Sequence, residues 1–217
     1  MGGVRKEIRS ALPEPDTEVN NGRVAVFFDR DGTLIEDVGY LASPNGLRLI
    51  PGAAEAVARL NQRDVLTCVV SNQSGVARGL FTEADLVPIH RRLDAELAAR
   101  HARLDRIYYC PHHPTEGSPP YNVICDCRKP AVGMLERAAR ELGVALDRSF
   151  VVGDKTIDVQ TGIAAGARAI LVLTGYGAAS FDECRAEGIT PAYVAPTVVE
   201  AVTFILQQLE EDGEKHA

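Results

Sequence analysis

The sequence predicts an α/β fold with a mostly parallel sheet and helices on both faces. Short apolar runs alternate with segments of helical periodicity along the 217 residues. This alternation is typical of parallel strands joined by crossover helices. Several apolar runs end in acidic or polar residues, and ligands of open α/β sheets bind at the carboxyl ends of strands. We therefore expect the functional site at that edge of the sheet.

The individual elements follow from the same patterns. Strands are expected at residues 24–28, 66–70, 104–109, 150–152 and 169–172, and helices at about 53–62, 82–101, 133–142, 159–166 and 198–209. Thr82 and Asp85 have the spacing of a capping box. Pro88 predicts a kink or a later start in that helix, which also contains His90 and His101. Residues 34–41 are expected to form a short hairpin or flap.

Composition and charge restrict the class of protein. Hydrophobic residues make up 46% of the chain and charged residues 24%, and the net charge is -7. A nucleic-acid partner is disfavoured by that charge. Neither a membrane span nor the apolar core of a secretion signal is visible. We expect a cytoplasmic monomer with an N-terminal arm (1–22) and one domain (23–212).

Two carboxylates, Asp29 and Asp31, follow the first strand, and Gly32 then permits a sharp turn. Carboxylates this close repel each other unless a cation neutralises them, which favours a hard divalent metal such as Mg²⁺. The alternative is a turn in which an aspartate caps a backbone amide. The polar segments 71–75 and 153–158 follow two other strands. Together they favour a phosphate and metal site at the strand ends.

Three of the five cysteines are clustered near histidines. The odd total of five cysteines and the lack of a secretion signal argue against a disulfide framework. Cys110, His112, Cys125 and Cys127 form a Cys₃His set that suits a tetrahedral, structural Zn²⁺ stapling the loop 110–127. His113 is an alternative ligand, and unrelated reduced thiols are the alternative interpretation. Cys68 is expected to be a buried, inert thiol.

Four segments in this order resemble the four motifs of the haloacid dehalogenase (HAD) superfamily of phosphatases: Asp29-Arg30-Asp31-Gly32-Thr33, Ser71-Asn72-Gln73-Ser74-Gly75, Arg128-Lys129-Pro130 and Gly153-Asp154-Lys155. The resemblance covers about residues 24–177. It implies a HAD-like Rossmannoid three-layer fold without a large cap domain. The zinc loop is similar to that of a narrower group acting on small phosphorylated sugars or on histidinol phosphate. The long spacer here favours the sugar-bisphosphate enzymes.

The resemblance also implies roles for individual residues. Asp29 would be the nucleophile that forms an aspartyl-phosphate, and Asp31 the general acid and base. Mg²⁺ would be held by Asp29, the Asp31 carbonyl and Asp154, with Asp158 supporting these ligands from behind. The phosphoryl group and substrate would be bound by Asp37, Val38, Gly39, Tyr40, Ser71, Asn72, Gln73, Ser74, Arg128, Lys129 and Lys155. Ser71 stands where the family often has Thr, and it keeps the hydroxyl. A phosphate-binding or zinc-stapled scaffold without turnover is the non-enzymatic alternative.

Overall fold

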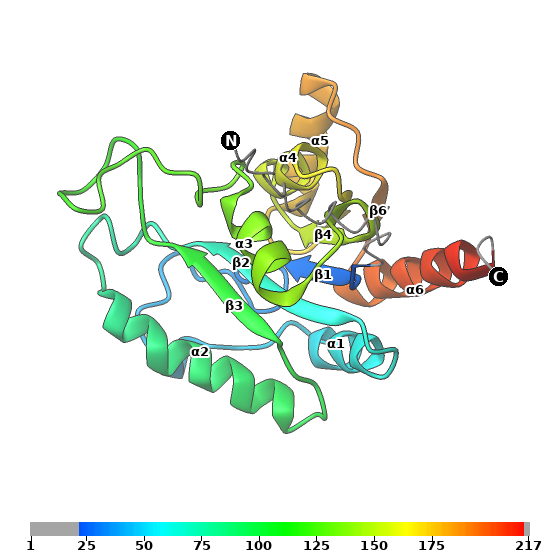
Figure 1. The fold of residues 1–217 in the computed structure, drawn as a ribbon. Helices are drawn as coiled ribbons and strands as arrows, with labels where there is room; N and C mark the ends of the chain where they lie inside the picture. Colours follow the sequence, from blue (N-terminus) through cyan, green and yellow to red (C-terminus); the bar gives the residue numbers. More distant parts are fainter. Residues whose placement is uncertain (1–21, 215–217) are drawn as a thin grey trace, which may run out of the picture.

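Six parallel strands form a single sheet in the order β3-β2-β1-β4-β5-β6 (Figure 1). The structure, a computed structural model, describes residues 22–214, so most of the expected N-terminal arm (1–21) lies outside the described residues. The strands are β1 (Ala25–Phe28), β2 (Leu66–Asn72), β3 (Arg106–Cys110), β4 (Phe150–Gly153), β5 (Arg168–Val172) and β6 (Tyr193–Ala195). The expected α/β fold is confirmed.

Helices cover both faces of the sheet (Figure 1). They are α1 (Ala53–Asn61), α2 (Glu83–Ala98), α3 (Gly133–Leu142), α4 (Thr156–Ala164), α5 (Gly177–Glu187) and α6 (Val198–Glu214). Alternate residues of β1 enter opposite cores. Val26 and Phe28 pack with α1, α2 and α6, whereas Ala25 and Phe27 pack with α3. The central strand is therefore apolar along its whole length, as in sheets buried on both faces.

The strand order reverses between β1 and β4, and this reversal positions the site. The chain proceeds outward from β1 to β2 and β3, then crosses back to β4 on the other side of β1. Phe28 pairs with Val152, and the Asp29 amide donates to the Val152 carbonyl at 2.8 Å. Helices connected to the two halves diverge at such a reversal and leave a crevice at the carboxyl ends of the strands.

Some expected boundaries were wrong. The short hairpin over 34–41 does not form; a wider flap leaves at Ile35 and returns at Leu49, closed by Glu36 N donating to Arg48 O at 2.9 Å. β2 extends two residues further than expected, so Ser71 and Asn72 lie in the strand rather than in a loop. Both differences arise because pairing with a neighbouring segment extends order beyond the local apolar run.

In α2 the capping box of Thr82 and Asp85 is confirmed, and the helix begins directly after it at Glu83. The later start expected from Pro88 was wrong, because Pro88 lies inside the helix. His101 lies beyond the helix end, with a positive φ of 59°.

α5 and β6 were not predicted. The apolar residues of α5 do not form one clear stripe, and β6 is only three residues long. Among residues 22–214 there is no large cap domain, and no helix is both long and apolar enough to cross a membrane.

Candidate active site

Asp29 and Asp154 follow β1 and β4, so the reversal in strand order brings their carboxylates together. Asp154 is completely buried, and its Oδ2 accepts a hydrogen bond from the Tyr176 amide at 2.8 Å. A Cβ at Gly32 or Gly175 would lie 2.2 Å from that same oxygen. Both positions therefore need glycine for close approach as well as for their positive φ.

Lys129 is the cation at the centre of the site. Its buried Nζ donates to Asp29 Oδ1 at 2.8 Å, Asp158 Oδ1 at 2.5 Å and the Val70 carbonyl at 2.8 Å. These three bonds use all three ammonium hydrogens. Burial alone would raise the pKa of Asp29, but Lys129 and Lys155 outweigh it and leave the pKa lowered. The Asp29 carboxylate is thus ionised at neutral pH.

Two predicted binding residues hold neighbouring backbone. The Asn72 amide accepts from Lys129 N at 3.0 Å and donates to Lys129 O at 3.1 Å, which fixes the position of Lys129. Arg128 donates to the His112 carbonyl at 3.1 Å, so its guanidinium is directed toward the loop 110–127.

Asp158, expected to support the metal ligands from behind, pairs with Lys129. Asp29, Asp154 and Asp158 can bring carboxylate oxygens within 4.8 Å of one another. The Lys129 ammonium, however, lies between Asp29 and Asp158, and the other Asp158 oxygen accepts from Lys155 N at 3.0 Å. Asp158 is therefore the counter-ion of Lys129.

A second lysine lies on the open side of Asp154. Lys155 Nζ is 3.1 Å from Asp37 Oδ2, 3.5 Å from the Asp31 carbonyl and 3.9 Å from Asp154 Oδ1. Burial would lower the pKa of Lys155, but the surrounding carboxylates raise it. Burial, with repulsion from Asp29, raises the pKa of Asp154 to about 7. The oxygens on this side thus favour a cation.

A pocket of about 320 Å³ opens beside these groups. It is lined by Asp31, Asp37, Gly39, Tyr40, Asn72, Gln73, Ser74, Gly75, Lys155 and Tyr176. Most of the residues expected to bind substrate are therefore brought together. Val38 is 54% exposed and does not line the pocket, and neither do Ser71, Arg128 or Lys129. Tyr176 was missed by sequence reasoning, although the glycines on both sides of it mark a turn after β5.

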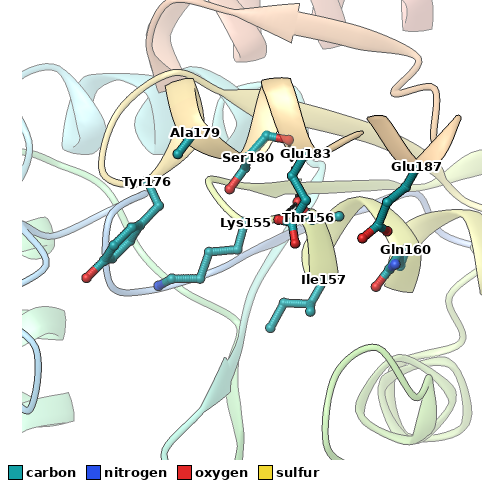
Figure 2. Close-up of a pocket in the computed structure, with 9 residues that line it drawn as sticks. All are labelled: Lys155, Thr156, Ile157, Gln160, Tyr176, Ala179, Ser180, Glu183 and Glu187. Carbon is teal, nitrogen blue, oxygen red and sulfur yellow. Dashed lines mark hydrogen bonds between the residues drawn. The ribbon is translucent and has the colours of Figure 1, made fainter. Parts of the chain in front are cut away.

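A larger cavity of about 470 Å³ lies between α4 and α5 and shares Lys155 and Tyr176 with this pocket (Figure 2). Its end away from Tyr176 carries Gln160 and Glu187, and Glu183 lies beside Thr156, as Figure 2 shows. Carboxylates repel a phosphate, and the larger cavity lacks the paired aspartates. We therefore assign the candidate active site to the smaller pocket.

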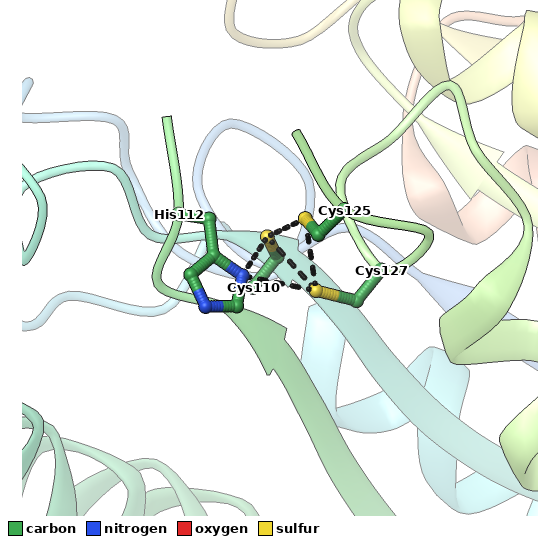
Figure 3. A group of neighbouring side chains, drawn as sticks. All are labelled: Cys110, His112, Cys125 and Cys127. Carbon is green, nitrogen blue, oxygen red and sulfur yellow. Dashed lines mark hydrogen bonds between the residues drawn. The ribbon is translucent and has the colours of Figure 1, made fainter. Parts of the chain in front are cut away.

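Cys110, the last residue of β3, converges with His112, Cys125 and Cys127 of the loop beyond it (Figure 3). Their sulfurs are 3.2–3.5 Å apart, and His112 Nδ1 is 3.4 and 3.7 Å from two of them. A tetrahedral zinc with bonds of about 2.3 Å to sulfur separates its sulfurs by about 3.8 Å. The four side chains fit such an ion after a small expansion. His113 is directed elsewhere, because its Nδ1 accepts from the Glu116 amide at 3.0 Å.

Comparison with known proteins agrees with this architecture. The family model described as HAD-hydrolase-like matches residues 126–201. The D-glycero-D-manno-heptose-1,7-bisphosphate 7-phosphatase of Chlorobaculum tepidum is 41% identical over 84% of this chain and 94% of its own length. The D-glycero-beta-D-manno-heptose-1,7-bisphosphate 7-phosphatase of Haemophilus influenzae is 39% identical over 86% and 98%.

The chain is a HAD-type hydrolase of the heptose-1,7-bisphosphate 7-phosphatase family. As a member of this family it is a phosphoric monoester hydrolase. The solved D,D-heptose 1,7-bisphosphate phosphatase from B. bronchiseptica, in complex with magnesium and phosphate, superposes with a TM-score of 0.76. It is 34% identical, with 85% of this chain and 99% of that chain covered. The corresponding enzyme from Burkholderia thailandensis gives a TM-score of 0.62 at 30% identity, with 86% and 99% covered.

Proposed function

We propose that this protein removes the 7-phosphate of D-glycero-D-manno-heptose 1,7-bisphosphate, a step in making heptose precursors of lipopolysaccharide. The observation that carries the proposal is the identity of about 40% with relatives of that name over nearly their whole length. The pocket supports it, because lysine and polar side chains line a space suited to a small phosphorylated sugar.

Mg²⁺ fits the oxygens around Asp154. The ligands would be the carboxylates of Asp29 and Asp154 and the carbonyl of Asp31, all hard oxygen donors. The Lys155 ammonium already lies 3.5 Å from the Asp31 carbonyl and 3.9 Å from Asp154, so a cation is accommodated there. When bound, Mg²⁺ supplies the positive charge that two aspartates and a phosphate need in order to coexist.

Asp29 is the proposed nucleophile. Lys129 holds Oδ1 of its ionised carboxylate, which leaves Oδ2 to attack phosphorus. A bond forms between Asp29 and phosphorus while the bond from phosphorus to the sugar oxygen breaks. One difficult displacement thus becomes two easier steps through an aspartyl-phosphate. Ser71, Lys129 and Lys155 are the proposed stabilisers of the phosphoryl charge, with Lys129 acting by its charge beside Asp29 because its three hydrogens are already used. Arg128 would join them once its guanidinium turns from the His112 carbonyl.

Asp31 is the proposed general acid and base. Its side chain lines the pocket and is 13% exposed, so it can meet the leaving sugar oxygen. It would give that oxygen a proton, then take one from the water that hydrolyses the aspartyl-phosphate. Asp37, Val38, Gly39, Tyr40 and the segment Asn72 to Ser74 would bind the sugar.

A structural Zn²⁺ is proposed at Cys110, His112, Cys125 and Cys127. All four positions of a tetrahedral ion would be filled by side chains, which leaves none for a substrate. We also infer that the protein is a cytoplasmic monomer. Cell fractionation and size-exclusion chromatography with light scattering would check these two points.

Phosphate release from a substrate panel tests the function. The panel contains both anomers of heptose 1,7-bisphosphate, histidinol phosphate and simple sugar phosphates, each with Mg²⁺ and with EDTA. We expect a kcat/KM preference of about 10²-fold or more for one heptose bisphosphate, equivalent to about 2.7 kcal/mol. Asp29→Asn is the folded, inactive control. A preference for histidinol phosphate would move the protein to another pathway, and no Mg²⁺-dependent release would contradict the proposal.

A further inference from the structure

Arg30 lies between the two aspartates of the first motif, and the proposed reaction does not use it. Its guanidinium is 1% exposed and is the largest fully buried side chain among residues 22–214. It does not line the substrate pocket. Burying a permanent charge is costly unless that charge is paired and hydrogen-bonded. The partners of Arg30 therefore indicate its purpose.

The guanidinium grips Asp31 with two hydrogen bonds. Arg30 Nε donates to Asp31 Oδ2 at 3.1 Å, and Nη2 donates to Oδ1 at 3.1 Å. Such a two-point contact defines the plane of the carboxylate as well as its distance. The residues are neighbours in sequence, so the tight turn after β1 folds one side chain onto the next.

Gln73, directly after the end of β2, completes the clamp. Its Nε2 donates to Asp31 Oδ2 at 3.0 Å and to Ser71 Oγ at 2.8 Å, while its Oε1 accepts from Arg30 Nη2 at 3.0 Å. The amide is thus engaged at both ends, and the side chain is almost completely buried. Gln73 braces Arg30 and Asp31 at once.

His90 closes the remaining side of Arg30. Its Nε2 is 3.5 Å from Arg30 Nη1, and its ring packs against Tyr109 at 5.6 Å between centroids. Burial, helped by Arg30, lowers the pKa of His90 to about 4. The imidazole is therefore neutral at pH 7 and can accept a hydrogen bond from Arg30 without repelling it.

We propose that Arg30 and Gln73 are positioning residues that hold the Asp31 carboxylate in one orientation for proton transfer. The proposal rests on the proposed function, in which Asp31 is the acid and base. Correct orientation of a reacting group removes much of the entropic barrier to its reaction. Without the clamp Asp31 would rotate freely and protonate the leaving oxygen less often. Binding of the phosphate would be little changed.

The test compares leaving groups. A sugar alkoxide must be protonated as it leaves, whereas the nitrophenolate of p-nitrophenyl phosphate departs without a proton. General acid catalysis is worth about 10²–10⁴-fold. We expect Arg30→Gln to lower kcat/KM by about 10²-fold on heptose bisphosphate and by less than about 10-fold on p-nitrophenyl phosphate. The comparison uses kcat/KM because it covers only the steps up to departure of the leaving group, whereas kcat also includes hydrolysis of the aspartyl-phosphate, which both substrates share. An equal loss on both substrates would indicate a merely structural role and overturn the proposal.

Gln73→Met is the second variant, because it keeps the Arg30–Asp31 pair if Arg30→Gln fails to fold. It should show the same leaving-group pattern more weakly. A rise in KM without a fall in kcat would make Gln73 a substrate contact and contradict its positioning role.

A double-mutant cycle separates this inference from the proposed function. In an Asp31→Asn background, Arg30→Gln should have no further effect, because residues that act as a unit are not additive. Additive losses would overturn the inference alone. Full activity of Asp31→Asn would instead refute the proposed role of Asp31. Crystal structures of wild type and Arg30→Gln give a readout independent of turnover. Asp31 should be rotated or mobile in the variant, and an unchanged Asp31 would contradict the proposal.

Discussion

At the scale of single residues, the Lys129 ammonium holds the candidate active site together. It pairs with Asp29 and Asp158, and all three groups are buried. Removing one partner of a buried ion pair is strongly destabilising, because the charge left behind has no compensation. Lys129 therefore has two roles at once: it orients the proposed nucleophile, and it permits two carboxylates to be buried side by side.

We predict that Lys129→Met lowers the free energy of unfolding by about 3–5 kcal/mol, measured by urea unfolding at pH 7.5 in EDTA. The double variant Lys129→Met, Asp158→Asn is the matched control. It removes the Asp158 carboxylate that Lys129→Met leaves unpaired, and it should recover part of the lost free energy of unfolding. A free energy of unfolding for Lys129→Met within about 1 kcal/mol of the wild-type value would contradict the stabilising role of the buried Asp29–Lys129–Asp158 pairs.

Asp154 gives a prediction for pH. Its ordinary pKa is 3.8, and the folded, metal-free protein raises it to about 7. Between these values the folded state binds a proton that the unfolded state has lost. Stability should therefore fall as pH rises from about 4 to about 7, by at most about 4 kcal/mol. Urea unfolding in EDTA at several pH values would measure this slope.

Asp154→Asn is the control for that slope, because the amide does not titrate. Mg²⁺ at a hundred times its Kd should stabilise the wild type at pH 7.5 by about 2.7 kcal/mol and leave the variant unchanged. The same slope in both proteins would show that Asp154 does not carry the pH dependence.

At the scale of elements, the loop 110–127 reaches from β3 to the mouth of the pocket. Glu116 is 3.4 Å from Arg78, and a Cβ at Gly117 would lie 1.8 Å from the Ala77 carbonyl. The loop thus contacts Ala77 and Arg78, which belong to the segment that continues from Ser74 and Gly75, and these two residues line the pocket. Tyr121 donates to Glu83 at 2.8 Å and ties the same loop to α2. Order in this loop should therefore support the substrate-binding segment.

We predict that Cys125→Ser abolishes stoichiometric zinc, makes the loop sensitive to protease and raises KM about tenfold or more, with a smaller fall in kcat. The reason is that the loop contacts the pocket wall and none of the reacting carboxylates. Metal analysis, limited proteolysis and steady-state kinetics measure the three effects. Cys184→Ser, a buried cysteine away from the cluster, should keep its zinc. A zinc-free variant with wild-type KM would contradict the prediction, because it would show that order in the loop does not affect substrate binding.

At the scale of the whole molecule, the reversal of strand order explains why residues 29, 129 and 154 meet. β1 and β4 are adjacent although more than 120 residues separate them, and Lys129 reaches Asp29 from the segment before α3. The two central strands are buried on both faces. Because the two larger apolar cores pack on these strands, the site lies at the end of the most deeply buried part of the sheet, and the flap and the loop 110–127 surround it.

The fold class, most strand and helix positions, the four motifs and the Cys₃His set could all be predicted from the sequence. Those features depend on apolar periodicity and on the order and spacing of residues, which are local properties. It missed α5 and β6, where the periodic signal is weak or short. The candidate site residues Asp29, Asp31, Asp154 and Lys155 were also found from the motifs alone.

The pairing of the charged side chains, by contrast, became visible only in the folded chain. Nothing in the sequence shows that Lys129 lies between Asp29 and Asp158, that Asn72 holds the Lys129 backbone, or that Arg30 and Gln73 clamp Asp31. The physical reason is that an ion pair depends on distance and burial, and packing sets both between segments remote in sequence.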